Sequence, residues 1–173
     1  GWENASECMV LVELLNTLRL SRIALHARTG KQQYKGHPDL EAFQGFYELC
    51  QHPLYYNGGI ESLSDIRQIL IRFPLLKGVF IGRGLLSSPL LAKEFKGNET
   101  FLPEQRMSIY FAFHEELFSA YSQVLQGETQ LLVKMKTLWE YFLPETDRKL
   151  LKRIKKSTRL QQYTESVKAI FTS

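Results

Sequence analysis

Three short segments of this sequence combine residue types that can bind an anion. Asn57-Gly58-Gly59 and Gly82-Arg83-Gly84 each follow a short apolar run, and His26 and Arg28 follow another. A phosphate needs backbone N–H groups at close range, which glycine permits, and a guanidinium adds charge-assisted hydrogen bonds. Either glycine turn alone would be read as a plain strand-to-helix connection, but the pair favours a phosphate site. His26 is either a hydrogen-bonded wall residue or a donor to a ligand ring or phosphate.

Other kinds of site find little support in the sequence. His37, His52 and His114 have no partners at metal-ligand spacing, so we expect surface or packing roles and no metal site. No Ser-His-Asp or Cys-His arrangement can be read from the spacing. Two cysteines, Cys8 and Cys50, are too few for a disulfide scaffold and are expected to be buried free thiols.

The first 96 residues alternate between helical and strand patterns. Strands are predicted over 22–27, 53–56 and 77–81, and helices over 6–18, 38–50, from Ser62 or Ser64 to 73, and 87–95. The short connections predict parallel βαβ units. Function in such proteins collects at the carboxyl ends of the strands, and each of the three candidate segments lies at such an end.

The pattern changes after residue 96. Residues 97–103 read as a linker, and helices are predicted over 104–125, 128–142, 145–155 and 158–171. The expected domains are therefore an α/β domain over 1–96 and a small all-α domain over 104–173. The 173 residues fall short of the roughly 250 of a complete (β/α)8 barrel.

Positive charge is concentrated in the predicted helical domain. Residues 127–173 contain ten basic and five acidic residues, whereas residues 1–126 contain twelve basic and thirteen acidic ones. This asymmetry indicates either a polyanion-binding surface or a solvated helix face. The candidate cations for RNA are Lys134, Lys136, Lys149, Lys152, Arg153, Lys155, Lys156 and Arg159. No apolar run approaches the 20 residues that a membrane span needs, and no signal peptide is visible, so we expect a cytoplasmic protein.

Three strings, taken in order and spacing, resemble the tRNA-dihydrouridine synthases. They are the segments from Leu25 to Tyr34, from Asn57 to Ile60, and from Phe80 to Gly84. That family consists of flavin-dependent (β/α)8 enzymes that reduce uridines in tRNA. The resemblance is strongest over 22–92 and weakest after 125, and it extends to the opening Gly1-Trp2-Glu3-Asn4, which is similar to the segment after the family's fifth strand.

The resemblance implies a role for each matched residue. His26 would contact FMN, and Arg28 would face the flavin or the uridine. Asn57 and Gly58 would take the FMN phosphate, with Gly82 and Arg83 as the second phosphate loop. Gly59 stands where the family usually has Asp, which keeps the backbone N–H and removes an acidic side chain.

The resemblance also implies what lies outside this sequence. The family's catalytic cysteine lies in an Asn-x-Gly-Cys-Pro motif and its active-site lysine on the fifth strand, and neither is found here. The chain is thus expected to be a C-terminal fragment: about three parallel strands of a TIM barrel followed by a helical tRNA-binding domain. We expect it to be inactive alone, to retain FMN weakly or not at all, and to self-associate through exposed sheet edges. FMN and NADPH would be the cofactors of the parent enzyme, which passes hydride to C6 of uridine while an acid protonates C5.

Two other interpretations stay open from the sequence. One is another FMN- or phosphate-binding barrel, such as a dihydroorotate dehydrogenase relative, which would not need the basic helical tail. The other is a non-catalytic RNA-binding module, in which the glycine turns are only turns and residues 104–173 carry the function.

Overall fold

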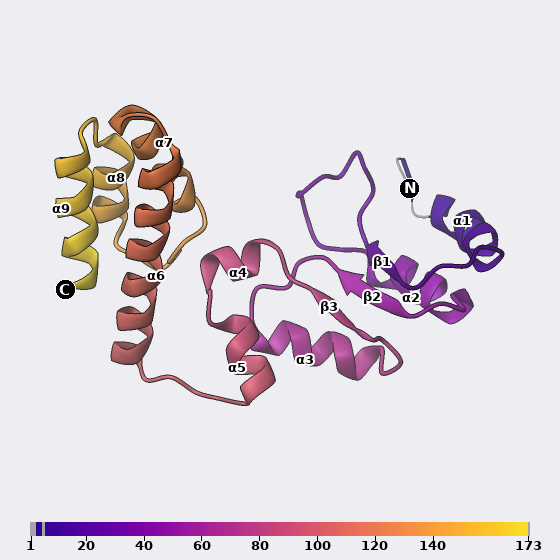
Figure 1. Ribbon diagram of the computed structural model, residues 1–173. Helices are drawn as coiled ribbons and strands as arrows, with labels where there is room; N and C mark the ends of the chain where they lie inside the picture. The colour runs from indigo at the N-terminus through magenta and orange to yellow at the C-terminus, as the bar shows by residue number, and fades with distance from the viewer. Residues whose placement is uncertain (1–2, 5, 173) are drawn as a thin grey trace. The chain divides into compact units, whose positions relative to one another are not determined.

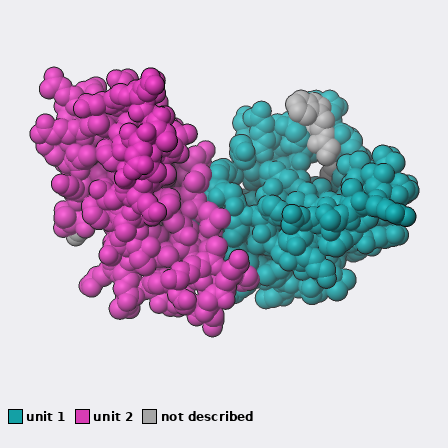
Figure 2. Space-filling model, in the orientation of Figure 1, with its two compact units in different colours: residues 1–84 teal, residues 85–173 magenta. Residues whose placement is uncertain are grey.

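The computed structural model describes residues 3–4 and 6–172, and these form two compact units. The first unit comprises residues 1–84 and the second residues 85–173 (Figure 2). No helix in the described part of the chain is long and apolar enough to cross a membrane.

The first unit alternates helices and strands around a small parallel sheet (Figure 1). Its strands are β1 (Ile23–His26), β2 (Leu54–Asn57) and β3 (Gly78–Phe80), paired in the order β1-β2-β3. Its helices are α1 (Glu7–Asn16), α2 (Leu40–Leu49) and α3 (Leu63–Arg72). Both strand pairs are parallel, so the predicted α/β fold is confirmed, and it is consistent with part of a TIM barrel.

The two faces of this sheet differ in burial. Leu54 and Tyr56 of β2 are buried, and the Tyr56 ring packs edge-on against Phe43 of α2 at 4.8 Å between ring centroids. Tyr55 and Phe80 lie on the opposite face, where Phe80 is 46% exposed. Since parallel sheets are almost always covered on both faces, this second face is one that a complete barrel would fill with side chains.

The helices of the first unit begin where their capping residues predict. Asp39 caps α2 by accepting a hydrogen bond from the backbone N–H of Ala42 at 2.9 Å. Ser62, rather than Ser64, caps α3 and forms a capping box with Asp65. Ser6 occupies the N-cap position of α1, but its side chain makes no capping hydrogen bond and instead donates to Asn4 Oδ1.

The second unit is helical. After the short α4 (Arg83–Ser87), which begins within the last two residues of the first unit, come α5 (Leu91–Gly97), α6 (Pro103–Val124), α7 (Glu128–Leu138), α8 (Arg148–Lys156) and α9 (Leu160–Phe171). The predicted helix over 87–95 is partly wrong: a helical turn already starts at Arg83, and Pro89 separates it from α5 because proline disfavours a helical residue before it. The α7 helix ends at Leu138 rather than 142, since the following turn directs Trp139 and Phe142 into the core.

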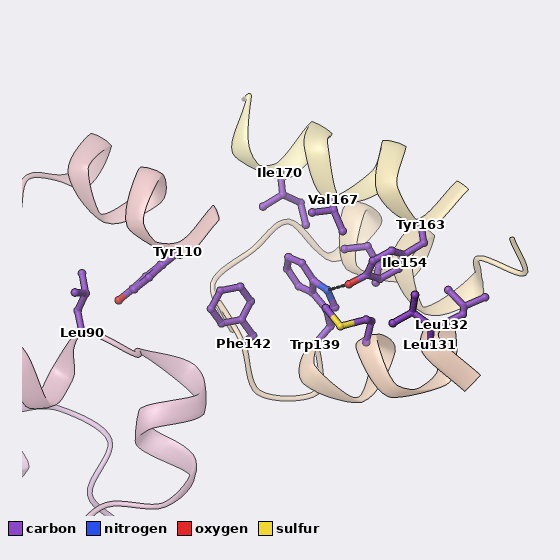
Figure 3. Packing of buried hydrophobic residues seen from close by; sticks show 11 residues of the cluster. Leu90, Tyr110, Leu131, Leu132, Trp139, Phe142, Ile154, Tyr163, Val167 and Ile170 are labelled. Atoms are coloured by element: carbon purple, nitrogen blue, oxygen red, sulfur yellow. Dashed lines mark hydrogen bonds between the residues drawn. The ribbon is translucent and has the colours of Figure 1, made fainter. Parts of the chain in front are cut away.

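The core of the second unit has a group of aromatic side chains at its centre. Figure 3 shows Trp139, Phe142 and Tyr163 at its centre, with Trp139 Nε1 donating to the Tyr163 hydroxyl at 2.9 Å. His114 of α6 is also buried, and its Nε2 lies 2.7 Å from the same hydroxyl. The packing role expected for His114 is therefore confirmed.

A polar network joins α5 to α6 across the connection at 98–102. The buried carboxylate of Glu94 accepts a hydrogen bond from Arg106, whose Nη1 also donates to the Tyr110 hydroxyl at 3.3 Å. Ser88 Oγ lies 2.7 Å from that hydroxyl. These bonds explain why α5 belongs to the same compact unit as the helices that follow it.

Candidate functional site

A pocket of about 220 Å³ lies at the carboxyl ends of the three strands. Parallel pairing places His26 opposite Asn57 and Asn57 opposite Phe80, so the loops that follow the strands meet at one edge. All seven residues predicted to bind a cofactor line this pocket: His26, Arg28, Asn57, Gly58, Gly59, Gly82 and Arg83. The prediction did not include Tyr34, Ile60, Glu61, Phe80 and Gly84, which line it as well.

His26 is positioned by the last backbone pairing of the sheet. The N–H of Ala27 donates to the carbonyl of Asn57 at 3.3 Å, which brings the ends of β1 and β2 together. Burial lowers the pKa of His26, and the positive charges of Arg28 and Arg83 lower it further. The imidazole is therefore neutral at neutral pH, so it carries one donor and one acceptor nitrogen.

Arg28 has hydrogen-bonding capacity that the described residues do not use. Its Nη2 donates to the carbonyl of Gly36 at 2.9 Å, which ties it to the loop after β1. Its Nε and Nη1 are buried and have no hydrogen-bond partner among the described residues. Buried guanidinium nitrogens are costly without an acceptor, so an anionic or carbonyl-bearing ligand at this pocket would complete the arrangement.

The glycines of the pocket divide into two groups. A Cβ atom on Gly84 would clash with the backbone carbonyl of Ile60, and one on Gly59 would lie 3.0 Å from the Pro38 ring. Gly59 also has a φ of +61°, a conformation that other residues rarely adopt. By contrast, a Cβ on Gly82 would meet nothing within 4 Å. The packing of this chain thus accounts for Gly59 and Gly84, whereas the open space at Gly82 suits close approach of a ligand to the backbone.

Tyr34 and Arg83 form the outer wall of the pocket. The guanidinium carbon of Arg83 lies 4.5 Å from the centroid of the Tyr34 ring, a cation–π contact that links the loop after β1 to the end of β3. Tyr34 is 69% exposed. Tyr34 is the last residue of the string from Leu25 to Tyr34, which carries part of the resemblance. The resemblance assigns no role to the Tyr34 side chain.

Neither cysteine lines this pocket. Cys8 is buried in α1 and lines a neighbouring cavity of about 110 Å³, which shares His26 and Arg28 with the pocket. Cys50 is only partly buried, contrary to expectation, because it ends α2. Its Sγ lies 3.7 Å from the carbonyl of His52. Within the described residues no cluster of His, Cys, Asp or Glu could hold a metal ion.

A second candidate site is a cationic groove between α8 and α9. It has a volume of about 410 Å³ and is lined by Lys149, Lys152, Arg153, Lys156, Ser157, Gln162, Glu165 and Ser166. The four cations follow the i, i+3, i+4, i+7 spacing of one helix face and are exposed. None of them has an ion-pair partner in the described part of the chain. Such a row of unpaired cations suits a polyanion.

The other predicted RNA-binding residues lie outside this groove. Lys155 and Arg159 are exposed and lie close to the groove residues in the sequence. Lys134 lies over the ring of Tyr121, with its Nζ 5.4 Å from the ring centroid. Lys136 donates from Nζ to the carbonyl of Ser157 at 2.9 Å, so its ammonium caps the end of α8. Lys136 therefore already has a structural partner, which a charge count along the sequence could not reveal.

Comparison with known proteins gives a consistent picture. A family model described as dihydrouridine synthase (Dus) matches residues 1–172. A probable tRNA-dihydrouridine synthase of Aquifex aeolicus is 34% identical over 86 residues, which cover 50% of this chain and 27% of that protein. The tRNA-dihydrouridine(16) synthase of Escherichia coli is 26% identical over 104 residues, which cover 60% of this chain and 33% of that protein. The matched segments thus span about a third or less of these two relatives.

Proposed function

Because the chain belongs to the dihydrouridine synthase family, we propose that its pocket is the FMN-binding end of a tRNA-dihydrouridine synthase. The observation that carries this proposal is the convergence of the three strand-end segments on one pocket, beside two buried guanidinium nitrogens of Arg28, Nε and Nη1, that have no acceptor among the described residues. A phosphate held by backbone N–H groups and by Arg83 fits the chemistry of this lining. His26 and Arg28 are the residues that would face the flavin ring or the uridine.

When bound, FMN would supply the hydride-transfer chemistry, with NADPH as the reductant of the parent enzyme. The residues of this chain would bind and orient the cofactor. A neutral His26 can donate a hydrogen bond to a ring carbonyl or nitrogen without bringing a further positive charge into the pocket. We place the catalytic acid outside this chain, since neither Cys8 nor Cys50 lines the pocket.

The three strands would act as the last three strands of a (β/α)8 barrel. The exposed sheet face that holds Tyr55 and Phe80 supports this, as does the unpaired outer edge of β1 in the described sheet. By itself, the chain would cover that face through self-association, with a second copy as the partner. Light scattering on a gel-filtered sample tests this expectation, and a monodisperse monomer would contradict it.

The cationic groove would bind the sugar-phosphate backbone of tRNA. Its four unpaired cations lie on one face of α8, and phosphate contacts of this kind give affinity that falls with salt. We propose the helical domain as the part that positions tRNA and the α/β domain as the part that positions FMN. The target base would leave its stack to reach the flavin.

The Gly82→Ala variant tests the cofactor assignment. A methyl group at this position meets no protein atom within 4 Å, so folding should be unaffected while the approach of a phosphate is blocked. We expect FMN to shift the backbone amide resonances of Gly58, Gly82 and Arg83 in NMR titrations of the wild-type chain, with weak affinity. The dissociation constant should rise about tenfold in the variant, as expected for the loss of one charge-assisted hydrogen bond.

Riboflavin, which lacks the phosphate, is the matched ligand control and should leave these amides unshifted. Equal shifts with riboflavin, or equal FMN affinity of the wild type and Gly82→Ala, would contradict a phosphate site at this pocket. Unchanged thermal unfolding of the variant is required for the comparison to count.

A further inference from the structure

We propose that Pro38 is a positioning residue that holds the Gly58-Gly59 loop in its binding conformation. Pro38 belongs to the loop before α2, and it is not among the described residues that line the pocket. It would therefore act through the glycine loop and not by touching a ligand. The inference deepens the proposed function and rests on it only for the identity of the ligand.

Pro38 is itself anchored to the end of the sheet. The next residue, Asp39, donates from its backbone N–H to the carbonyl of Ala27 at 2.8 Å, which fixes the loop against the end of β1. The Asp39 side chain caps α2, so the same residue is also held to the helix. The proline ring restricts its own φ, which leaves this segment little freedom.

The Pro38 ring lies directly against the glycine loop. A Cβ atom on Gly59 would be 3.0 Å from Pro38 Cγ and 3.2 Å from Cδ. A Cβ on Gly58 would be 3.3 Å from Pro38 Cγ and 3.0 Å from His26 Cδ2. The imidazole and the pyrrolidine ring therefore both fill the space beside Gly58 that a side chain would need.

The contact with the Pro38 ring matters because the glycine loop has an otherwise permissive backbone. Gly58 and Gly59 have φ values of +139° and +61°, and free glycine populates many other conformations. A loop that must be ordered on binding loses affinity to conformational entropy, whereas a loop held in advance does not. Pro38 would thus preset the direction of the loop N–H groups that the phosphate would meet.

The Pro38→Ala variant tests this role in two measurements. In the ligand-free protein, we expect the ¹⁵N order parameters of the Gly58 and Gly59 amides to fall from about 0.85 to below about 0.6, while those of the β1–β2 ladder stay unchanged. In FMN titrations, we expect the dissociation constant to rise about threefold to tenfold, with riboflavin unaffected. Pro53→Ala, which removes an exposed proline before β2 in the same unit, is the matched control and should change neither quantity.

The pairing of Pro38 with Gly59 can be tested separately. Gly59→Ala should lower the melting temperature by several degrees in the wild-type background, and by roughly half as much in the Pro38→Ala background, because the ring that the methyl group meets is gone. Unchanged order parameters of the loop amides in Pro38→Ala, or identical effects of Gly59→Ala in the two backgrounds, would overturn the proposal. If the wild type shows no response to FMN while these order-parameter and coupling results hold, the cofactor assignment fails and the positioning role of Pro38 stands.

Discussion

The pocket of the first unit and the cationic groove of the second are both suited to phosphate, but they are built by opposite means. The pocket depends on backbone held in place by close packing: Gly84 lies against the carbonyl of Ile60, and Gly59 lies against Pro38. The groove depends on four long cationic side chains that project from one helix, and Lys149 is the first and Lys156 the last of them along the sequence. The first arrangement is sensitive to the size of single side chains, and the second to the number of charges.

This difference predicts how each site responds to substitution. A packed backbone site fails when one methyl group is added, since the surrounding atoms cannot move apart without loss of other contacts. A charged helix face loses affinity gradually, because each cation contributes a similar share that salt can screen.

The largest effect is expected from Gly84→Ala. The added Cβ would overlap the carbonyl oxygen of Ile60, a backbone atom that cannot rotate away. We expect the free energy of unfolding to fall by about 3 kcal/mol, measured by urea denaturation with circular dichroism. Gly82→Ala, two residues earlier, is the control and should cost under about 0.5 kcal/mol. Similar stability of the two variants would show that the pocket is not closely packed.

Removal of the charges in the groove should weaken RNA binding without unfolding the helical unit. We expect the combined variant K149Q/K152Q/R153Q/K156Q to bind tRNA about 100-fold more weakly near 0.1 M salt. The slope of log K against log salt should decrease by about 3, since four phosphate contacts are lost. Gel shifts across a salt series measure both quantities.

A control with the same change in net charge separates the groove from charge in general. It carries four substitutions of exposed cations in the first unit, R19Q, R22Q, R67Q and K77Q. An equal loss of affinity in this control would mean that the groove has no special role.

The buried histidine of the second unit should make its stability depend on pH. Burial lowers the pKa of His114, while the adjacent Glu115 opposes this shift. With the neutral ring, Nδ1 can donate to Glu115 and Nε2 can accept from Tyr163, whose oxygen also accepts from Trp139. Protonation of His114 would make Nε2 a second donor to the Tyr163 oxygen, beside Trp139 Nε1. The proton of the Tyr163 hydroxyl would then have no acceptor among the described residues.

We therefore expect the free energy of unfolding to keep its full value above the unfolded-state pKa of about 6.5 and to decrease as the pH falls below it. The loss should be about 1 kcal/mol, the usual scale of one buried hydrogen bond. His114→Gln should flatten the dependence of the melting temperature between pH 7 and 5, whereas His37→Gln, a change at an exposed site in the first unit, should not. An unchanged slope in His114→Gln would refute this assignment.

The smallest effect is expected from Glu165→Gln. Glu165 is the only acidic residue among those that line the groove, so its removal should strengthen tRNA binding about twofold to threefold, as is usual for one exposed charge. Glu145→Gln, outside the groove but in the same unit, removes the same charge as a control. Equal gains from both variants would indicate a general effect of net charge.

Much of the arrangement could be predicted from the sequence because it depends on local signals. Apolar runs beside turn-forming residues predicted the strands, and helix starts were predicted at 38–39 and at Ser62 or Ser64, where the structure has Asp39 and Ser62 as the N-caps. The convergence of Asn57 and Arg83 on one pocket followed from parallel pairing, which brings strand ends to one edge. The start of α4 at Arg83 was missed, because Gly82-Arg83-Gly84 has the composition of a turn.

Other features depend on contacts between residues that are distant along the chain. The positions of the strands along the chain, the positions of the glycine turns and the excess of charge after residue 127 could be read from the sequence, since each depends on neighbouring residues. Only the tertiary structure decided that Gly59 packs on Pro38, that Gly82 faces open space, and that Lys136 caps α8. The physical reason is that a glycine or a lysine has the same local signature whether a ligand, a solvent molecule or another part of the chain occupies the space beside it.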